Sequence, residues 1–414
     1  MLDKIMAVAL ASAACISATV ANAEPVKVAL IETLSGGQAV TGKLFQAAVK
    51  YGLEKVNKDK AWADGVVLLE YDNQGGPPEA ADKLKAAIND GAQIIIQGAS
   101  SAIGGQITAD VQKHNARNPG KEIMYINVGA EAMEFTGNKC HFYHFRWNGN
   151  ADIRLKAMLT AMKEANVLGK KIYVIGQNYS WGHDVQKLAK EYASKFDYTI
   201  VGDVIHDVNK IQDFAPYVAK IKEAGPDTVI TGNWSNDLLL LMKAAGDSGL
   251  KSRFLAYWID QPGNIANAGD TALGHYTLST YFPDANGEAT EKLAADFKTK
   301  TGNVPLNVQG HTLHGMWGLG EALKGVKPGA DGKLSVKSLA FAMEKVSFES
   351  SMGKITMRPD DHQALIPLAV AVVSKDAKFK ADNTDKGFKT IKLLNAEQAA
   401  APVQSNCKME RPAP

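Results

Sequence analysis

The chain has 414 residues, of which 45% are hydrophobic and 22% charged, and its formal net charge at pH 7 is +2. Acidic and basic residues are interleaved, so the charge pattern gives no reason to expect binding to nucleic acid or to a membrane surface. The length exceeds what one ordinary core holds and predicts two domains or more.

Residues 1–23 have the pattern of a secretory signal peptide. Lys4 precedes a short apolar run that ends in Ala21-Asn22-Ala23, a typical cleavage site before Glu24. The run is too short and too rich in small residues to be a membrane-spanning helix. We therefore expect an exported protein that is cleaved after Ala23.

Two features could tie such a protein to a membrane, and neither fits well. Cys15 would be the lipidated residue of a lipoprotein, but Ser12 stands where a large aliphatic residue is needed. The longest later apolar run, residues 364–373, is about half of the ~20 residues that a spanning helix requires, and it contains Pro367. No stable membrane insertion is expected.

From residue 26 onward, β-branched apolar runs alternate with stretches of helical period. Strands are expected at 26–32, 65–71, 94–98, 123–128 and 142–147, and then at 172–176, 199–206, 228–232 and 253–258. Helices are expected near 43–58, 77–89, 101–114, 151–166, 182–195, 213–224 and 235–248. This alternation is typical of βα units with parallel strands, and its restart near residue 146 predicts two similar α/β lobes.

The last part of the chain breaks this alternation. A strand-like run at 275–280 is followed by two or three helices across 289–346, and then by extended runs that look antiparallel, at 353–358, 368–375 and 388–394. Such a tail cannot form a domain alone. We expect it to add strands or covering to the earlier lobes, so that the chain crosses between them more than once.

The loop after the first strand, GGQAVTGKL at residues 36–44, is one residue short of a phosphate-binding P-loop. Leu44 stands where a Ser or Thr hydroxyl would hold Mg²⁺. The loop still offers small residues and free backbone N–H groups between a strand and a helix. We expect no cofactor here, a solvent-exposed Lys43, and contacts with some other ligand. The residues expected to make these contacts are Ser35, Gly36, Gly37 and Gln38.

Small polar residues follow two further strands of the first lobe. Gly98-Ala99-Ser100-Ser101 leads directly into a helix, and Asn127-Val128-Gly129-Ala130-Glu131 follows the next strand. Ligands bind beyond the carboxyl ends of strands in open α/β sheets, and the N–H groups at a helix N-terminus attract anions. These loops fit a carboxylate, although the same residue types also form ordinary turns and caps.

Aromatic residues take the same positions in the second lobe. Trp147, Trp181, Trp234 and Trp258 each fall at or just past the end of an expected strand, together with Tyr179 and Tyr257. An aromatic wall that faces an amide-lined wall suits a small ligand with an apolar body and an anionic end. The alternative is that these rings pack the interface between the lobes.

Signals for catalysis or metal binding are weak. Residues 98–102 do not match G-x-S-x-G, and His311 and His314 lack a third ligand or a general-base Glu. His141 and His144 lie in a strand-like segment, where they are expected to point to opposite faces. No metal site is expected.

Two cysteines remain after removal of the leader, Cys140 and Cys407. In an exported protein such a pair, far apart in sequence, most simply forms one disulfide. Two free thiols are the alternative.

The ordered set of motifs resembles the periplasmic ligand-binding proteins of branched-chain amino-acid-type ABC transporters. The motifs are VKVALIETLSGGQAVTGK, GASSAIGGQI, INVGAEAMEFT, FRWNGN, NYSWGHDV, GNWSNDLLLLMKAAGDSGLKSRFLAYW and GKITMRPDDHQ. The resemblance covers essentially all of residues 24–414. It implies the type I periplasmic binding protein fold, with two Rossmann-like lobes, three crossover strands and a ligand in the interlobe cleft. Lobe 1 would comprise 24–145 and 280–354, and lobe 2 would comprise 146–279 and 355–414.

The resemblance also implies roles for individual residues. Ser100 or Ser101 resembles the family's carboxylate-binding serine. Gly129 and Glu131, with Asn127 nearby, resemble the contacts after strand four, and Trp181 and Trp234 fall on the ligand wall.

This sequence departs from the family's pattern at the positions that contact the ligand's ammonium group. The glutamate that meets this group in leucine-, isoleucine- and valine-binding members is replaced here by Trp258, with Asp260 two residues on, and a supporting threonine is replaced by Glu131. Either the acid has moved to Glu131 or Asp260, or the ligand has no ammonium. The tryptophans favour an aromatic or aliphatic carboxylate over an amino acid, and short amides are a further alternative.

The implied function is capture of a small molecule by closure of the lobes and its delivery to a membrane permease driven by a cytoplasmic ATPase, without chemistry on the ligand. Two alternatives remain open. One is a ligand-sensing subunit that passes its closed state to a receptor. The other is a secreted α/β hydrolase that uses Ser100 or Ser101, which would need a histidine and an acid nearby.

Overall fold

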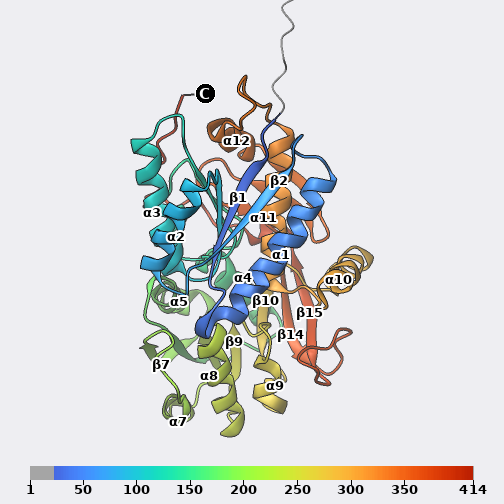
Figure 1. Cartoon of the computed structure of the whole chain (residues 1–414). Helices are drawn as coiled ribbons and strands as arrows, with labels where there is room; N and C mark the ends of the chain where they lie inside the picture. Colours follow the sequence, from blue (N-terminus) through green and yellow to red (C-terminus); the bar gives the residue numbers. More distant parts are fainter. Residues whose placement is uncertain (1–22, 414) are drawn as a thin grey trace, which may run out of the picture.

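A computed structural model describes residues 23–413, so the predicted leader, apart from Ala23, lies outside the described residues. Figure 1 shows two α/β lobes, one containing β1, β2 and α1 and the other containing β7, α7 and α8. Within the described residues, no helix is both long and apolar enough to cross a membrane.

The first lobe is built on a parallel sheet with the strand order β2-β1-β3-β4-β5. Its strands are β1 (Val26–Glu32), β2 (Val66–Asp72), β3 (Ile94–Gln97), β4 (Met124–Asn127) and β5 (His144–Arg146). Its first helices are α1 (Ala39–Lys58), α2 (Pro77–Asn89) and α3 (Ser101–Arg117), with 3₁₀ turns η1 (Gly36–Gln38) and η2 (Met133–Thr136).

Helices cover both faces of this sheet, which explains the nearly continuous apolar run of β1. Val28 and Leu30 belong to the same buried cluster as residues of α1. Ala29 and Ile31, which point the other way, belong to a cluster with residues of α2 and α3.

The second lobe contains a seven-stranded sheet with the order β15-β14-β10-β9-β8-β6-β7. Its parallel strands are β6 (Lys171–Gln177), β7 (Thr199–His206), β8 (Thr228–Thr231), β9 (Arg253–Ala256) and β10 (Tyr276–Ser279). Its helices are α4 (Ala151–Glu164), α5 (Ser180–Glu191), α6 (Ala193–Phe196), α7 (Ala215–Ala224), α8 (Ser235–Asp247) and α9 (Asn264–Ala268), followed by η3 (Gly269–Ala272). The tail adds the antiparallel strands β14 (Leu368–Ser374) and β15 (Gly387–Leu394), as the sequence predicted.

The segment between β10 and β14 returns to the first lobe. It forms α10 (Glu288–Thr301), α11 (Asn307–Lys324), α12 (Val336–Met343) and a small sheet of β11 (Ser347–Ser350), β12 (Gly353–Met357) and β13 (Ala364–Leu365). α11 packs along α1. Gln363 bridges to Arg146 of β5.

The residue ranges expected for the lobes stay a prediction, but strand pairing places the last crossing later than residue 354. β12 pairs with β11 and β13, not with the seven-stranded sheet, so the chain leaves the first lobe only between Leu365 and Leu368. After α13 (Ala396–Ala399) it returns once more, because Cys407 is bonded to Cys140.

The C-terminal tail is fastened to the first lobe by that disulfide and by hydrogen bonds. The S–S distance of the Cys140–Cys407 bond is 2.05 Å. Gln404 Nε2 donates to Met133 O at 2.7 Å. The chain end accordingly lies near α12 (Figure 1), where Lys337 Nζ donates to Ala413 O at 3.2 Å. Assigning all of 355–414 to the second lobe therefore disagrees with these contacts.

One expectation about side-chain direction is wrong. β5 starts only at His144, so His141 lies in the preceding turn, and the centroids of the two imidazole rings are 5.9 Å apart. His141 Nε2 lies 3.1 Å from Thr108 Oγ1. The period-two rule does not apply to residues outside a strand.

Candidate functional site

A small cavity lies between the two lobes. From the first lobe it is lined by α1 and by the loops after β3 and β4. From the second lobe it is lined by the loops after β6, β8 and β9. The lining residues are Thr41, Phe45, Gly98, Ala99, Ser100, Ser101, Gly129, Glu131, Tyr179, Trp181, Trp234, Trp258 and Gln261.

The loop after β3 is held from beneath by Glu32. The carboxylate of Glu32 is buried and accepts hydrogen bonds from Gly98 N at 2.9 Å and Ala99 N at 3.1 Å. Burial raises the pKa of Glu32 to about 7, against the backbone hydrogen bonds, which lower it. This acid fixes the backbone that leads into the N-terminus of α3.

Ser100, at the N-cap of α3, has an unusual backbone conformation. Its φ of +74° and ψ of 119° lie where residues other than glycine are rare. Backbone strain of this kind is concentrated at ligand-binding sites, where surrounding contacts enforce it.

Two glycines allow the ring of Phe45 to reach these loops. A Cβ atom on Gly98 would lie 2.3 Å from Phe45 Cε1, and a Cβ atom on Gly129 would lie 2.5 Å from Phe45 Cζ. Any larger residue at either position would displace the ring from the cavity wall.

The loop after β4 is tied to the start of α3. Ser101 Oγ accepts hydrogen bonds from Glu131 N at 3.2 Å and Ala132 N at 3.1 Å. Asn127 Oδ1 accepts from Gly129 N at 3.1 Å and Ala130 N at 2.8 Å. These bonds place Glu131 directly beside the helix N-terminus.

Glu131 is buried and forms an ion pair with Arg154 through Oε1, which also accepts a hydrogen bond from Asn148 Nδ2. Its second oxygen, Oε2, has no hydrogen-bond partner within residues 23–413. Burial raises the pKa of Glu131 to about 7, although the Arg154 guanidinium acts to lower it. Glu131 thus lines the cavity with one carboxylate oxygen that is free to accept a hydrogen bond.

Arg154 links this acid to the second lobe. Its Nη2 donates to Tyr257 O at 2.8 Å and to Leu278 O at 3.0 Å. Its guanidinium carbon lies 4.6 Å from the ring centroid of Trp258, a cation–π contact.

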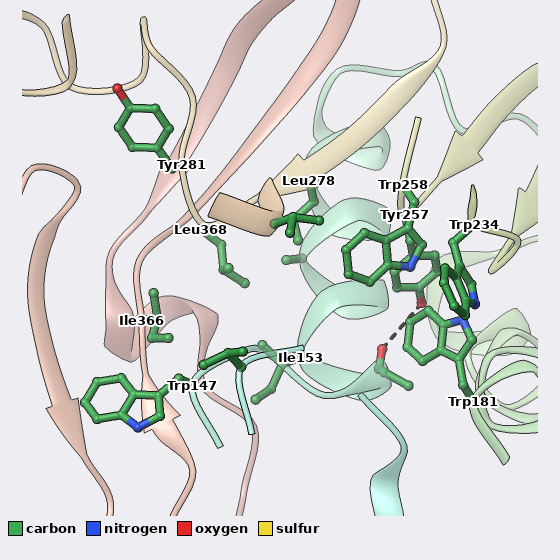
Figure 2. Packing of buried hydrophobic residues seen from close by; sticks show 14 of the residues in the cluster. Trp147, Ile153, Trp181, Trp234, Tyr257, Trp258, Leu278, Tyr281, Ile366 and Leu368 are labelled. Atoms are coloured by element: carbon green, nitrogen blue, oxygen red, sulfur yellow. Dashed lines mark hydrogen bonds between the residues drawn. The ribbon is translucent and has the colours of Figure 1, made fainter. Parts of the chain in front are cut away.

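The aromatic wall of the second lobe is anchored by the polar ends of its rings. Trp181 Nε1 donates to Gly232 O at 2.8 Å, and Trp234 Nε1 donates to Tyr179 OH at 2.7 Å. Trp181 also packs edge-to-face on Tyr257, with ring centroids 4.8 Å apart. Figure 2 shows Trp181, Trp234 and Trp258 gathered together, with Trp147 far from them. Burial raises the pKa of the Tyr179 phenol, which therefore stays protonated.

Several residues predicted to contact a ligand do line the cavity, and their contact role stays a prediction. They are Ser100, Ser101, Gly129, Glu131, Tyr179, Trp181, Trp234 and Trp258. Trp147 does not, because its ring packs against α11, where a Cβ atom on Gly318 would lie 2.0 Å from it.

Six other predicted residues do not line the cavity. Asn127 shapes the loop after β4 from below, as described above. Asp260 lines a neighbouring groove, and its Oδ2 accepts from Asn307 N at 2.8 Å. The loop after β1 forms the turn η1 before α1 begins at Ala39. Its four residues outside the cavity lining are Ser35, Gly36, Gly37 and Gln38.

The sequence did not point to Thr41, Phe45 or Gln261. Thr41 and Phe45 are four residues apart on α1, so both face the cavity. Gln261 follows the loop after β9, and its Oε1 accepts from Ser235 N at 2.7 Å.

Hydrogen bonds between the lobes surround the cavity. Ser235 Oγ of the second lobe donates to Gly37 O of the first at 3.3 Å. Met133 N of the first lobe donates to Asp184 Oδ2 of α5 at 2.8 Å. The lobes are therefore closed on one another around the cavity.

Comparison with known proteins gives concordant results. Residues 25–378 match the family model described as "Periplasmic binding protein". The chain is 53% identical over 406 residues to the "Leu/Ile/Val-binding protein homolog 4" of Brucella abortus, covering 98% of this chain and 97% of that protein.

Solved structures show the same fold. A "leucine-, isoleucine-, valine-, threonine-, and alanine-binding protein" from Brucella ovis in a closed conformation superposes with a TM-score of 0.89 at 53% identity, covering 94% of this chain and 100% of the other. An ABC transporter solute-binding protein of R. palustris in complex with benzoate has a TM-score of 0.78 at 19% identity, covering 93% and 100%.

Proposed function

The chain belongs to the periplasmic binding protein family, and from this premise we propose that it captures a small amino-acid-type ligand between its lobes for an ABC importer. Members of this family bind substrates and are not enzymes. Capture takes place in the periplasm, after export and removal of the leader. The closed protein then delivers the ligand to a membrane permease that is coupled to a cytoplasmic ATPase.

The free oxygen of Glu131 carries the proposal. Because Ser101 Oγ accepts from Glu131 N at 3.2 Å, the acid and the N-terminus of α3 are neighbours in one wall. An α-amino acid carries its carboxylate and its ammonium on the same carbon atom. Its carboxylate would bind at Ser100 and the helix N-terminus, and its ammonium would bind at Glu131 Oε2.

This proposal revises the preference for an organic acid. That preference rested on the absence of an acid at the position of Trp258, whereas the placement of Glu131 supports a relocated ammonium site. The names of the 53% identical relatives support an amino acid as well. The benzoate complex is of a protein only 19% identical, and that likeness extends to the fold alone.

Closure follows from contacts that only a bridging ligand makes. A ligand held by α3 and Glu131 on one side and by Trp181, Trp234 and Trp258 on the other binds the closed form more tightly than the open form. The population therefore shifts toward the closed form. The interlobe bonds Ser235–Gly37 and Met133–Asp184 add to this preference.

Ser101 fits the role of a scaffold. Its Oγ accepts two backbone N–H groups, which orient the loop that carries Glu131. Among the described residues, no histidine lines the cavity, so no observation favours the hydrolase alternative.

A thermal-shift screen with amino acids, benzoates, hydroxycinnamates and dicarboxylates tests the proposal. A ligand at 100 times its Kd should stabilise the protein by about 2.7 kcal/mol. Stabilisation by zwitterionic amino acids supports the proposal. Stabilisation by aromatic or dicarboxylic acids alone would overturn it.

A further inference from the structure

The unpaired polar atoms of the cavity are mostly hydrogen-bond donors. Among the residues that the structure describes, the buried side-chain atoms of the lining without a partner are Thr41 Oγ1, Glu131 Oε2, Trp258 Nε1 and Gln261 Nε2. Trp258 Nε1 and Gln261 Nε2 can only donate, and Thr41 Oγ1 can donate or accept. Only Glu131 Oε2 must accept while the carboxylate is ionised.

Tyr179 adds another donor to this set. Its phenolic oxygen already accepts from Trp234 Nε1 at 2.7 Å, which leaves the O–H free to donate. A carboxylate ligand can accept several such donors at once.

Among the unpaired side-chain atoms of the lining, a primary ammonium meets two possible acceptors, Glu131 Oε2 and Thr41 Oγ1. It carries three N–H donors, each of which needs an acceptor when buried. Oε1 of Glu131 is already engaged by Arg154 and Asn148, so the acid offers a single oxygen. An ammonium nitrogen that carries methyl groups in place of N–H donors needs fewer hydrogen-bond acceptors and keeps its positive charge.

The other groups around the cavity suit such a nitrogen. Five of the lining residues are aromatic, namely Phe45, Tyr179, Trp181, Trp234 and Trp258. Aromatic rings around one carboxylate attract alkylated ammonium groups, because the ring faces are negative and the methyl groups are apolar. One ring, Trp258, already stabilises a cation, the guanidinium of Arg154 at 4.6 Å.

Taking these observations together, we propose that the preferred ligand carries an N-alkylated ammonium beside its carboxylate, as a betaine or an N-methylated amino acid does. The inference rests on the proposed function, since it assumes the zwitterion site of Glu131 and α3. The aromatic rings would surround the alkylated nitrogen, and the carboxylate would bind at Ser100 and the N-terminus of α3, with the donors of Trp258, Gln261 and Tyr179 on the opposite wall as its further partners.

Isothermal titration calorimetry of the mature chain with a series of matched ligands tests this inference. The series is L-valine, N-methyl-L-valine, N,N,N-trimethyl-L-valine and 3-methylbutanoate, the analogue without nitrogen. We expect affinity to rise by about 30-fold from valine to its trimethylated form, the size of one desolvated cation–π contact.

The possible outcomes distinguish the preference for an N-alkylated ammonium from the proposed function on which it rests. If N-methyl-L-valine binds more weakly than L-valine, this inference is overturned and the proposed function stands. Binding of 3-methylbutanoate at least as tight as that of every nitrogen-containing member would overturn both.

A variant pair adds a second readout. Trp234→Leu should lower affinity for trimethylvaline more than for valine, because only the former depends on ring faces. Trp317→Leu, at a half-buried tryptophan outside the cavity, should leave both affinities unchanged. Equal losses for both ligands with Trp234→Leu would contradict the aromatic cage.

Discussion

Glu131 of the first lobe and Arg154 of α4 form an ion pair in which both side chains are at most 1% exposed. Arg154 also holds the backbone of Tyr257 and Leu278, so the acid that faces the cavity is connected to the wall on the other side. The carboxylate shares its charge between this internal cation and, in our proposal, the cation of the ligand. In this proposal, the charge of the ligand and the position of the lobes are coupled through Glu131.

The raised pKa of Glu131 predicts that binding depends on pH. The ligand's cation binds the ionised carboxylate, so below a pKa of about 7 binding must release a proton. Affinity for L-valine should rise with pH between about 5 and 7, by at most about tenfold per unit, and then level off. Calorimetric titrations across this range measure it. Glu131→Gln, which keeps an oxygen for Arg154, should flatten the profile, and an equally steep profile in that variant would contradict the assignment.

Raised carboxylate pKa values also make the free energy of unfolding depend on pH, with a sign opposite to that of the affinity. Between the ordinary pKa of 4.5 and about 7, the folded protein binds more protons at Glu32 and Glu131 than the unfolded chain does. The free energy of unfolding should therefore fall as pH rises through this window. Urea unfolding at several pH values would reveal the slope, and Glu131→Gln should reduce it.

Gly42, part of the near-match to a P-loop, has a packing role that a substitution can reveal. A Cβ atom there would lie 1.7 Å from Thr33 O, so Gly42→Ala must push α1 away from the loop after β1. We expect a loss of about 1–3 kcal/mol or more in unfolding free energy, measured by urea denaturation. Gly37→Ala is the matched control, since nothing lies within 4 Å of its Cβ position. Equal stability of the two variants would show that the close approach is not needed.

The Cys140–Cys407 disulfide should stabilise the fold without affecting the cavity. The bond joins residues 267 apart and holds the tail against the first lobe. Replacing both cysteines by serine should lower the unfolding free energy by about 2–5 kcal/mol. Affinity for valine should stay the same, because neither residue lines the cavity. Reductant should destabilise the natural protein and leave the variant unaffected, whereas two free thiols detected by mass spectrometry in the exported protein would exclude the bond.

Much of the fold follows from periodicity. β1 spans the predicted residues 26–32, since an apolar run buried on both faces leaves a clear signal. The tail strands were also predictable. The return of the tail to the first lobe follows from the predicted Cys140–Cys407 disulfide, which the structure confirms, whereas single contacts such as that of Gln404 could not be predicted.

The site was predictable where it lies at strand ends and unpredictable elsewhere. The rule that ligands bind beyond the carboxyl ends of strands located Ser100, Glu131, Trp181 and Trp234 at the cavity. It also pointed to residues 35–38, which form the turn η1 and its N-cap and do not line the cavity. For Phe45, the indication in the sequence is indirect: Gly98 and Gly129 are the glycines that make room for its ring. Nothing in the sequence indicates that Arg154 is buried at the site, because a charged residue on an amphipathic helix is expected to be solvent-exposed unless its buried partner is known.

The central claim is that Glu131 recognises the ammonium of a zwitterionic ligand. The most direct test compares the calorimetric Kd of L-valine with that of 3-methylbutanoate, in the natural protein and in Glu131→Gln. The account predicts that the natural protein binds valine about 100-fold more tightly, which corresponds to about 2.7 kcal/mol for a buried charged hydrogen bond. In the variant, most of this difference should disappear. Equal or tighter binding of 3-methylbutanoate by the natural protein would contradict the account.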